Sequence, residues 1–307
     1  MVERLTLANP MRMRIAVTGA SGFLGRSLCP VLQARGHEVV ALDRGQIGDF
    51  TAVSDWRPLI AGADAVVHLA AIAHRSNVTA ARLSEVNRGV PLALGRAAAA
   101  AGARLLFMSS VKVHGEQTHV GAFDEASAYL PEDPYARAKA EAEMGLRAIP
   151  GLKLSVIRPP LVYGPGVKGN FLLLLRAVAS GWPLPLAALE NRRSFVYSGN
   201  LADAVARCVE SPQAAGRSYL VCDGRARSTP ELCGAIGVAL GRPARLFPFP
   251  AHWLDLAESL GKLTQSLEVD DGAIRRELAW TPPHSFEAGL RETAGWFRTS
   301  HGARSAR

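Results

Sequence analysis

The sequence predicts an α/β protein in which a doubly wound, parallel, Rossmann-type sheet is joined to a smaller α/β lid domain that binds substrate. A strand, a glycine-rich turn and a helix follow one another near the start, over 15–34. Strand and helix patterns then alternate to about Arg158, which is typical of a parallel sheet covered by helices. After Pro159-Pro160 the pattern changes to short strands and helices separated by glycine and proline. The 307 residues, 48% of them hydrophobic, can bury a core of this size.

The first element is the strand Ile15–Val17, followed by glycines with the spacing G-x-x-G-x-x-G and a helix to about Ala34. This spacing differs from the G-x-G-x-x-G of the commonest dinucleotide-binding fold. Glycine lacks a Cβ atom, so backbone N–H groups can approach a pyrophosphate, and the helix N-terminus presents its positive dipole end to that anion. The sequence therefore predicts a dinucleotide contact at Gly19, Ser21, Gly22, Phe23, Leu24 and Gly25.

The second predicted strand, 38–43, ends in an acid. Asp43 follows the glycine turn by about 20 residues, where a carboxylate binds the adenosine ribose hydroxyls; an aspartate in an ordinary turn is the alternative. Arg44 beside it suits a 2′-phosphate, but Asp43 repels that group. We therefore expect NAD(H) as cofactor rather than NADP(H).

Further cofactor contacts are expected at the next two segments. The strand pattern over 64–71 ends in small residues against which a cofactor can lie, at Leu69, Ala70 and Ala71. Asp49 and Phe50 are candidates to flank the adenine, although Phe50 suits the core equally well. The helix expected over Val86–Ala101 is apolar almost all round, so we expect the sheet to cover one side and a partner subunit the other.

Ser110, Tyr135 and Lys139 form the one constellation that implies a reaction. The strand 104–110 ends at Ser110, and after a polar loop Pro134 begins a helix with Tyr135 and Lys139 one turn apart. A lysine and an oxidised nicotinamide favour the phenolate, which can take the proton of a substrate hydroxyl while hydride leaves the same carbon. Ser110 would hydrogen-bond that oxygen. An isolated Y-x-x-x-K is usually a coincidence; here it follows a dinucleotide loop.

The second half of the chain is expected to form the lid and the last strands of the sheet. Strands are predicted over 154–158, 195–197 and 219–222, and helices over 171–180, 201–209, 229–240, about 253–260 and 286–297. We expect a dinucleotide-binding domain of 13–163 plus about 195–222, a substrate domain of 164–194 plus about 223–299, and flexible tails at 1–12 and 300–307.

Composition and charge exclude several other classes. The net charge is +8, but the basic residues are scattered, which favours a small anionic ligand over nucleic acid. No apolar run reaches the roughly 18 residues of a membrane span, and the first 13 residues lack a signal-peptide core. The 4 cysteines show no metal-ligand spacing, so we expect free thiols, no metal site and a cytoplasmic protein.

Together, the glycine turn, His68-Leu69-Ala70-Ala71, Ser109-Ser110 and Tyr135-x-x-x-Lys139 resemble an extended short-chain dehydrogenase/reductase. More narrowly, they resemble the NAD-dependent epimerase/dehydratase group that acts on nucleotide sugars, with UDP-glucose 4-epimerase as its best-known member. The resemblance implies catalytic roles for Ser110 (not Ser109), Tyr135 and Lys139. It also implies that Lys139 contacts the nicotinamide ribose and that Pro160 lies beside the cofactor.

The same resemblance implies the substrate contacts. It places Asn170 and Arg193 on the diphosphate, and the planar fork of an arginine matches phosphate oxygens. We prefer Arg193 to Arg192; the alternative for both is a solvated charge pair. His114 stands where UDP-galactose epimerases typically carry a tyrosine, and it is either a substrate contact or a loop residue.

The expected activity is NAD(H)-dependent hydride chemistry at C4 of a UDP-hexose or UDP-N-acetylhexosamine, in a homodimer. The epimerase and a 4-ketoreductase of UDP-linked 4-keto-6-deoxy-N-acetylhexosamines, used in surface polysaccharide synthesis, rank nearly equal. The stretch Ser109–Glu116 resembles the subgroup that includes such reductases. A third interpretation is a non-catalytic NAD(P)-sensing protein, although such proteins often lack the tyrosine or the lysine.

Overall fold

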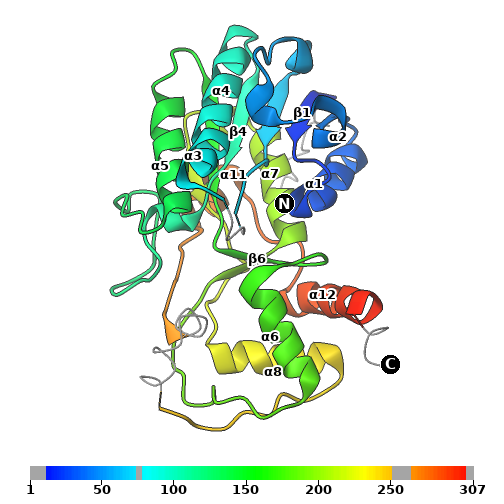
Figure 1. Ribbon diagram of the computed structural model, residues 1–307, viewed down its shortest axis with the longest axis vertical. Helices are drawn as coiled ribbons and strands as arrows, with labels where there is room; N and C mark the ends of the chain where they lie inside the picture. The colour runs from blue at the N-terminus through cyan, green and yellow to red at the C-terminus, as the bar shows by residue number, and fades with distance from the viewer. Residues whose placement is uncertain (1–11, 74–77, 251–263, 302–307) are drawn as a thin grey trace, which may run out of the picture.

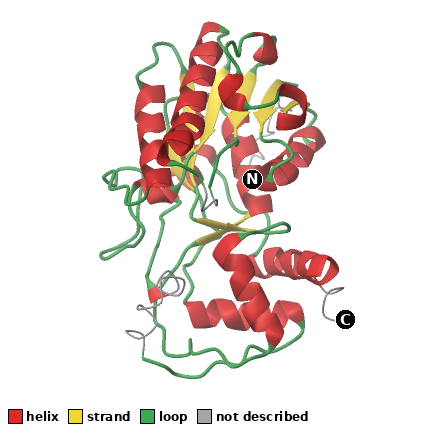
Figure 2. Ribbon diagram, in the orientation of Figure 1, coloured by secondary structure: helices red, strands yellow, loops and turns green. Residues whose placement is uncertain are grey.

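The centre of the molecule is a six-stranded parallel sheet in the order β2-β1-β3-β4-β5-β8 (Figures 1 and 2). The computed structural model describes residues 12–73, 78–250 and 264–301. The strands of this sheet are β1 (Arg14–Thr18), β2 (Glu38–Leu42), β3 (Ala65–His68), β4 (Arg104–Met108), β5 (Lys153–Arg158) and β8 (Ser218–Leu220). The strand order reverses between β1 and β3, which is where this class of fold binds its ligands. The predicted fold class is confirmed.

Helices cover both faces of the sheet (Figure 2). Because side chains alternate along a strand, Ile15 and Val17 pack with α1 and α7, whereas Ala16 packs with α4 and α5 on the other face. The helices are α1 (Phe23–Ala34), α2 (Arg44–Ile47), α3 (Ala80–Ser84), α4 (Val90–Ala100), α5 (Pro134–Arg147), α6 (Gly169–Ser180), α7 (Ser198–Glu210), α8 (Thr229–Leu240), α11 (Gly272–Leu278) and α12 (Phe286–His301).

The helix predicted over 86–101 begins in a wider turn and continues as α4. A wider π-helical turn, Glu85–Gly89, separates α3 from α4. Helix α4 then packs closely on α5: a Cβ atom added at Gly95 would lie 2.5 Å from the Leu146 side chain. Helix α5 therefore covers part of the apolar surface that the sequence assigned to a partner subunit.

A second, smaller sheet lies below the first and joins it to the helices α6, α8 and α12 (Figure 1). Its strands, β6 (Leu161–Tyr163) and β7 (Phe195–Tyr197), run parallel. Tyr163 is fully buried among aromatic rings, and its hydroxyl donates to Asp223 at 2.8 Å. This core is separate from the two clusters that flank the large sheet.

The structure adds elements that the sequence did not predict. Strand β6 begins directly after two prolines and is too short to show a periodic pattern, and α11 is a helix of only 7 residues. Helix α12 continues to His301, so residues 300 and 301, which the sequence placed in a flexible tail, are helical. The helix predicted at about 253–260 lies outside the described residues.

None of the helices in the described parts of the chain has the length and apolar character needed to cross a membrane.

Candidate active site

The glycine turn between β1 and α1 forms a tight backbone cradle. Gly19 has φ +73°, and a Cβ atom there would lie 3.0 Å from the backbone nitrogen of Ala70. At Gly25 a Cβ atom would lie 2.3 Å from the carbonyl oxygen of Ala20. Any side chain would therefore push apart the end of β1, the start of α1 and the segment after β3. The structure thus brings Gly19 beside Leu69 and Ala70, two of the predicted cofactor contacts.

The residues around this cradle fit a dinucleotide. The Oδ1 atom of Asp43, directly after β2, accepts a hydrogen bond from the Ser21 backbone nitrogen at 3.0 Å. The carboxylate therefore reaches the glycine turn, where a ribose would join a pyrophosphate. Helix α1 begins after Gly22 with neither a side-chain cap nor an acid in its first turn, which suits an anion. Phe23 and Leu24 begin this helix, and Arg44 begins α2 next to Asp43.

Two of the predicted adenine contacts have other roles in the structure. Phe50 is 5% exposed and packs 6.0 Å from the Trp56 ring, so it is the core residue that the sequence allowed as an alternative. Asp49 forms an ion pair with Arg82 and accepts from the backbone nitrogen of Thr51 at 3.0 Å. Phe50 is therefore not placed beside an adenine, whereas the Asp49 side chain stays half-exposed beside its ion pair, so its contact with the adenine remains a prediction.

The catalytic candidates gather at the end of β4. Tyr135 lies in the first turn of α5, which Asp133 caps by accepting from the Ala136 backbone nitrogen at 2.7 Å. One turn later, the Lys139 Nζ atom donates to the carbonyl oxygen of Met108 at 2.8 Å, and it lies 6.0 Å from the centre of the Tyr135 ring. Met108 is the last residue of β4, two residues before Ser110.

The two serines after β4 differ in accessibility. The Ser109 side chain is buried, and its hydroxyl has no hydrogen-bond partner among the described residues. Ser110 is partly exposed, and its hydroxyl accepts from the Lys112 backbone nitrogen at 3.3 Å. A hydroxyl must reach solvent to meet a substrate, so this difference supports Ser110.

Burial dominates the electrostatics of this site. It lowers the pKa of Lys139 to about 7, which the Glu143 carboxylate opposes. Burial and the Asp133 carboxylate raise the pKa of Tyr135 above its ordinary value. Without a cofactor, these directions favour the phenol at Tyr135. From the sequence, the phenolate is expected only when Lys139 and an oxidised nicotinamide act on Tyr135 together.

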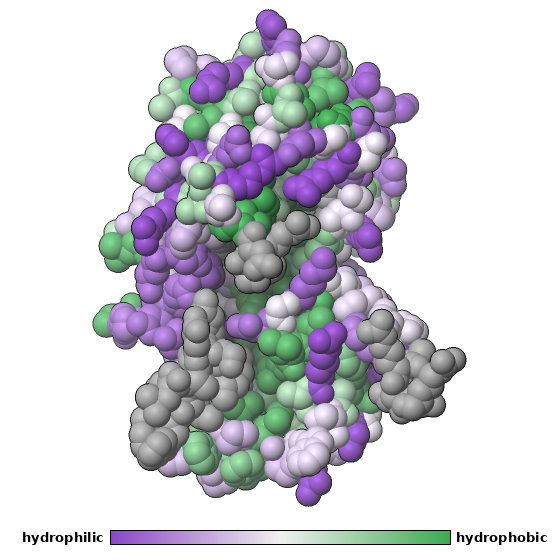
Figure 3. Space-filling model, in the orientation of Figure 1, coloured by the Kyte–Doolittle hydropathy of each residue, from purple (hydrophilic) through white to green (hydrophobic). Residues whose placement is uncertain are grey.

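The predicted diphosphate contacts belong to the lower part of the molecule. Asn170 is exposed in the first turn of α6. The backbone of Arg193 pairs with that of Arg227, and its Nη1 atom donates to the carbonyl oxygen of Gln265 at 2.9 Å. The surface is hollowed between the sheet-bearing part and this lower part (Figure 3).

Arg192 and Arg193 have different surroundings. Arg192 is exposed and pairs with Glu268 at 3.0 Å, so it is the solvated charge that the sequence offered as an alternative. Arg193 is partly buried, which lowers its pKa, and Glu116 opposes this effect. Glu116, which follows the turn after Ser110, is therefore near enough to the Arg193 guanidinium to affect its pKa.

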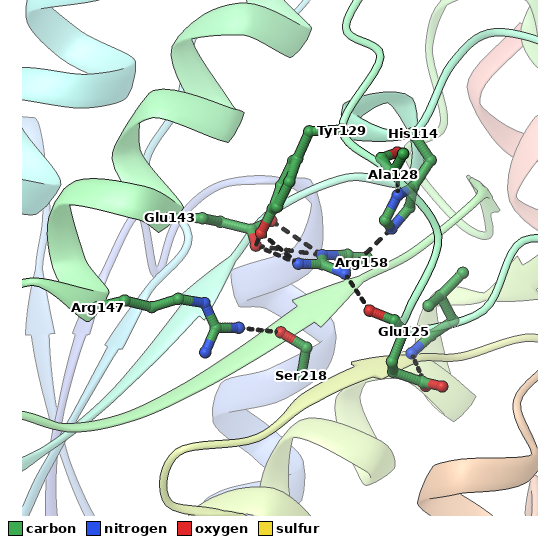
Figure 4. Close-up of polar contacts among 9 residues, drawn as sticks. His114, Glu125, Ala128, Tyr129, Glu143, Arg147, Arg158 and Ser218 are labelled. Carbon is green, nitrogen blue, oxygen red and sulfur yellow. Dashed lines mark hydrogen bonds and ion pairs between the residues drawn. The ribbon is translucent and has the colours of Figure 1, made fainter.

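His114 does not have the geometry of a substrate contact. It is 1% exposed, its Nδ1 atom lies 3.0 Å from the carbonyl oxygen of Ala128, and its Nε2 atom lies 3.0 Å from the Arg158 Nη1 atom (Figure 4). Burial lowers the pKa of His114, so the neutral ring donates through Nδ1 and accepts at Nε2. Both nitrogens are engaged within the protein. His114 is therefore the loop residue that the sequence allowed, and not the predicted substrate contact.

The residues to which His114 is joined were not predicted from the sequence. Arg158 pairs with Glu143 in the interior, and the hydroxyl of Tyr129 contacts both (Figure 4). One signal was present: Glu143 continues the one-turn spacing of Tyr135 and Lys139. Nothing local in the sequence indicated that Arg158 would be its partner.

Among the described residues, no group of three or more histidine, cysteine or acidic side chains lies close enough to bind a metal ion. The cysteines at 29, 208, 222 and 233 are free thiols.

Known proteins resemble this chain over nearly its whole length. A UDP-glucose 4-epimerase from Vibrio cholerae is 34% identical over 94% of this chain and 96% of its own length. The structure of DesIV, a dTDP-glucose 4,6-dehydratase from Streptomyces venezuelae with NAD and TYD bound, is 27% identical with a TM-score of 0.77, covering 95% of this chain and 98% of that one. The structure of a Thermus thermophilus UDP-glucose 4-epimerase in complex with NAD is 26% identical with a TM-score of 0.73, covering 93% and 99%.

The model of the NAD dependent epimerase/dehydratase family matches residues 15–222, from β1 through β8. This span includes the glycine cradle, the serine turn and the helix of Tyr135 and Lys139. The chain is therefore an enzyme, as the sequence favoured, and the interpretation as a non-catalytic sensor is set aside. The chain belongs to the NAD-dependent epimerase/dehydratase family of extended short-chain dehydrogenases/reductases.

Proposed function

We propose that this enzyme is an NAD(H)-dependent 4-epimerase of a UDP-hexose or UDP-N-acetylhexosamine. The observation that carries the proposal is the placement of Tyr135 and Lys139 beside the end of β4, at the same edge of the sheet as the glycine cradle. The relative of 34% identity over nearly its whole length, a UDP-glucose 4-epimerase, supports the same reaction.

Three side chains of the protein have separate roles in the reaction at C4 of the sugar. Bound NAD⁺ would supply the acceptor for the hydride that leaves C4. Tyr135 takes the proton of the 4-hydroxyl, and Ser110 donates a hydrogen bond to the same oxygen as it becomes a carbonyl. Lys139 places its positive charge beside Tyr135 and favours the phenolate. Tyr135 would return its proton to the sugar oxygen once the 4-keto sugar has turned its opposite face toward the cofactor, which would supply the hydride again.

The choice of cofactor and the binding of the substrate diphosphate are proposed from the charged residues nearest to each. Asp43 at the glycine turn favours a free ribose over a 2′-phosphate, so we propose NAD(H). Arg193 and Asn170 bind the diphosphate, because a partly buried guanidinium gives charge-assisted hydrogen bonds to phosphate. We further propose a homodimer through α4 and α5; a monomeric mass by light scattering would contradict it.

A 4-ketoreductase is the second candidate. Typical UDP-galactose epimerases carry a tyrosine at the position of His114, and here the position is occupied by a buried ring. A reductase uses half of the epimerase cycle and exchanges its cofactor at each turnover.

The deciding experiment uses freshly purified protein. The cofactor released on denaturation is identified by mass spectrometry, and the absorbance of the native protein is followed after addition of UDP-sugars. Near-stoichiometric bound NAD(H) that is reduced by a UDP-hexose without net consumption supports the epimerase. A protein that is purified empty and oxidises NADH only with a 4-keto sugar supports the reductase.

A further inference from the structure

A buried ionic cluster lies behind the catalytic helix. The side chains of Arg158, at the end of β5, and Glu143, on α5, are 3% and 0% exposed and approach to 2.6 Å. Attraction within such a pair rarely exceeds by much the cost of removing both charges from water. A contribution to stability alone therefore does not explain this buried ion pair, and its contacts suggest a different role.

Arg158 joins two segments that are far apart in the sequence. Through Nη2 and Nε it donates to both carboxylate oxygens of Glu143, and through Nη1 it donates to His114 Nε2 at 3.0 Å (Figure 4). Glu143 belongs to the helix of Tyr135, whereas His114 ends the turn that begins at Ser110. One guanidinium thus ties the serine loop to the tyrosine helix.

Tyr129 strengthens this connection. Its hydroxyl donates to Glu143 Oε2 at 2.7 Å and accepts from Arg158 Nη2 at 2.6 Å. Its ring stacks on that of His114, with centres 5.8 Å apart. Removal of this hydroxyl alone would weaken the connection and leave the ion pair in place.

Glu143 lies on the same side of α5 as the catalytic candidates, because Tyr135, Lys139 and Glu143 follow one another at four-residue intervals. Fixing Glu143 therefore fixes the rotation of the helix about its own axis. Its charge also opposes the burial effect that lowers the pKa of Lys139.

We propose that Glu143 and Arg158 are positioning residues that, through Tyr129 and His114, lock the loop after Ser110 to the helix of Tyr135 and Lys139. They set the distance at which Ser110 and Tyr135 meet the substrate oxygen. The kinetic part of this inference rests on the proposed function; the structural part does not.

The experiment compares Tyr129→Phe and Glu143→Gln with a matched control, Glu210→Gln. Glu210 has the same kind of partners, since it pairs with Arg35 at 2.8 Å and His37 at 3.0 Å, but it lies on α7, across the sheet from α5. All variants are assayed with the UDP-sugar that the wild type turns over, and hydrogen exchange of residues 114–130 is followed by mass spectrometry.

We expect Glu143→Gln to lower kcat by at least about 10-fold, because small misplacements of reacting groups are costly. KM and NADH affinity should stay within about two-fold of wild type. Tyr129→Phe should give a smaller loss of kcat and faster exchange in 114–130, and Glu210→Gln should change neither. If circular dichroism shows that Glu143→Gln does not fold, the results for Tyr129→Phe decide whether the inference holds.

Wild-type kcat and wild-type exchange in Tyr129→Phe would overturn the inference. A rise in KM equal to the loss in kcat/KM would also overturn it, since the cluster would then serve substrate binding. If the wild type turns over no UDP-sugar, the proposed function fails, and hydrogen exchange alone decides the positioning role.

Discussion

In the cofactor half of the site the backbone forms the binding surface, whereas in the sugar half long side chains are expected to form it. The glycine cradle is a local structure: the Gly22 nitrogen donates to the Gly19 carbonyl at 2.9 Å. Arg193, in contrast, is held by Arg227 and by Gln265, which is 72 residues away in the sequence. A change in the first half should therefore act on the cofactor alone, and a change in the second on the sugar alone.

The largest effect is expected where the two halves meet. Tyr135→Phe removes the only atom that we expect to transfer the proton, so it should lower kcat by about 10³-fold. The ring remains in place, so cofactor content should be unchanged. Progress curves with UDP-sugar and mass spectrometry of released NAD measure both quantities; turnover at the wild-type rate would refute the proposed mechanism.

Gly25→Ala should disable the cofactor half. Its Cβ atom would lie 2.3 Å from the Ala20 carbonyl oxygen and 2.4 Å from that of Gly19, so the backbone must move. Overpacking of this kind costs up to about 3 kcal/mol, which corresponds to a loss of roughly 100-fold in NADH affinity by calorimetry.

Gly45→Ala is the matched control, because a Cβ atom at Gly45, in α2, meets nothing within 4 Å. Its NADH affinity should equal that of the wild type. UDP affinity should be unchanged in both variants. If Gly25→Ala lowered the affinity for UDP as strongly as the affinity for NADH, the two halves would not be independent.

Arg193→Gln should affect the sugar half. A charge-assisted hydrogen bond contributes about 2 kcal/mol, so KM for the UDP-sugar should rise by about 30-fold while NADH affinity stays constant. Arg192→Gln removes an exposed charge that pairs only at the surface with Glu268, and it should change KM by less than about two-fold. Equal effects of the two variants would remove the distinction between them.

The same contrast explains what could be predicted from the sequence. The cradle was predictable because glycine spacing, strand and helix are adjacent in the chain. Tyr135 and Lys139 were predictable as neighbours because helical periodicity brings them together. The parallel character of the sheet followed from the alternation of strands and helices.

Contacts over long sequence distances were not predictable. Nothing near Arg158 indicates that it would bind Glu143 of another element, and nothing near His114 shows that both of its nitrogens would be engaged. Phe50 was ambiguous for a different reason: it lies in a three-residue turn, which is too short for periodicity to show that it packs on Trp56. Periodicity reports on neighbours along one element and carries little information on partners in another.

The smallest effect on activity is expected in the core that supports the cofactor half, where a change acts on stability instead. His68, at the end of β3, is 1% exposed; its Nδ1 atom lies 2.8 Å from the Thr18 hydroxyl, and its Nε2 atom has no partner among the described residues. Burial, and then the charge of Lys139, lower the pKa of His68 from 6.5 to about 3. Between these values the unfolded chain binds a proton that the folded chain does not, so stability falls as pH falls, by about 1.4 kcal/mol per pH unit.

His68→Asn should remove this contribution, so its free energy of unfolding should fall less steeply than that of the wild type between pH 6.5 and 4 in urea titrations. His119→Asn, which removes an exposed imidazole, is the matched control. Parallel slopes for the wild type and His68→Asn would mean that His68 takes up its proton without unfolding. In that case the core beneath the cradle would admit a charge, and the cofactor half would be less rigid than its backbone contacts indicate.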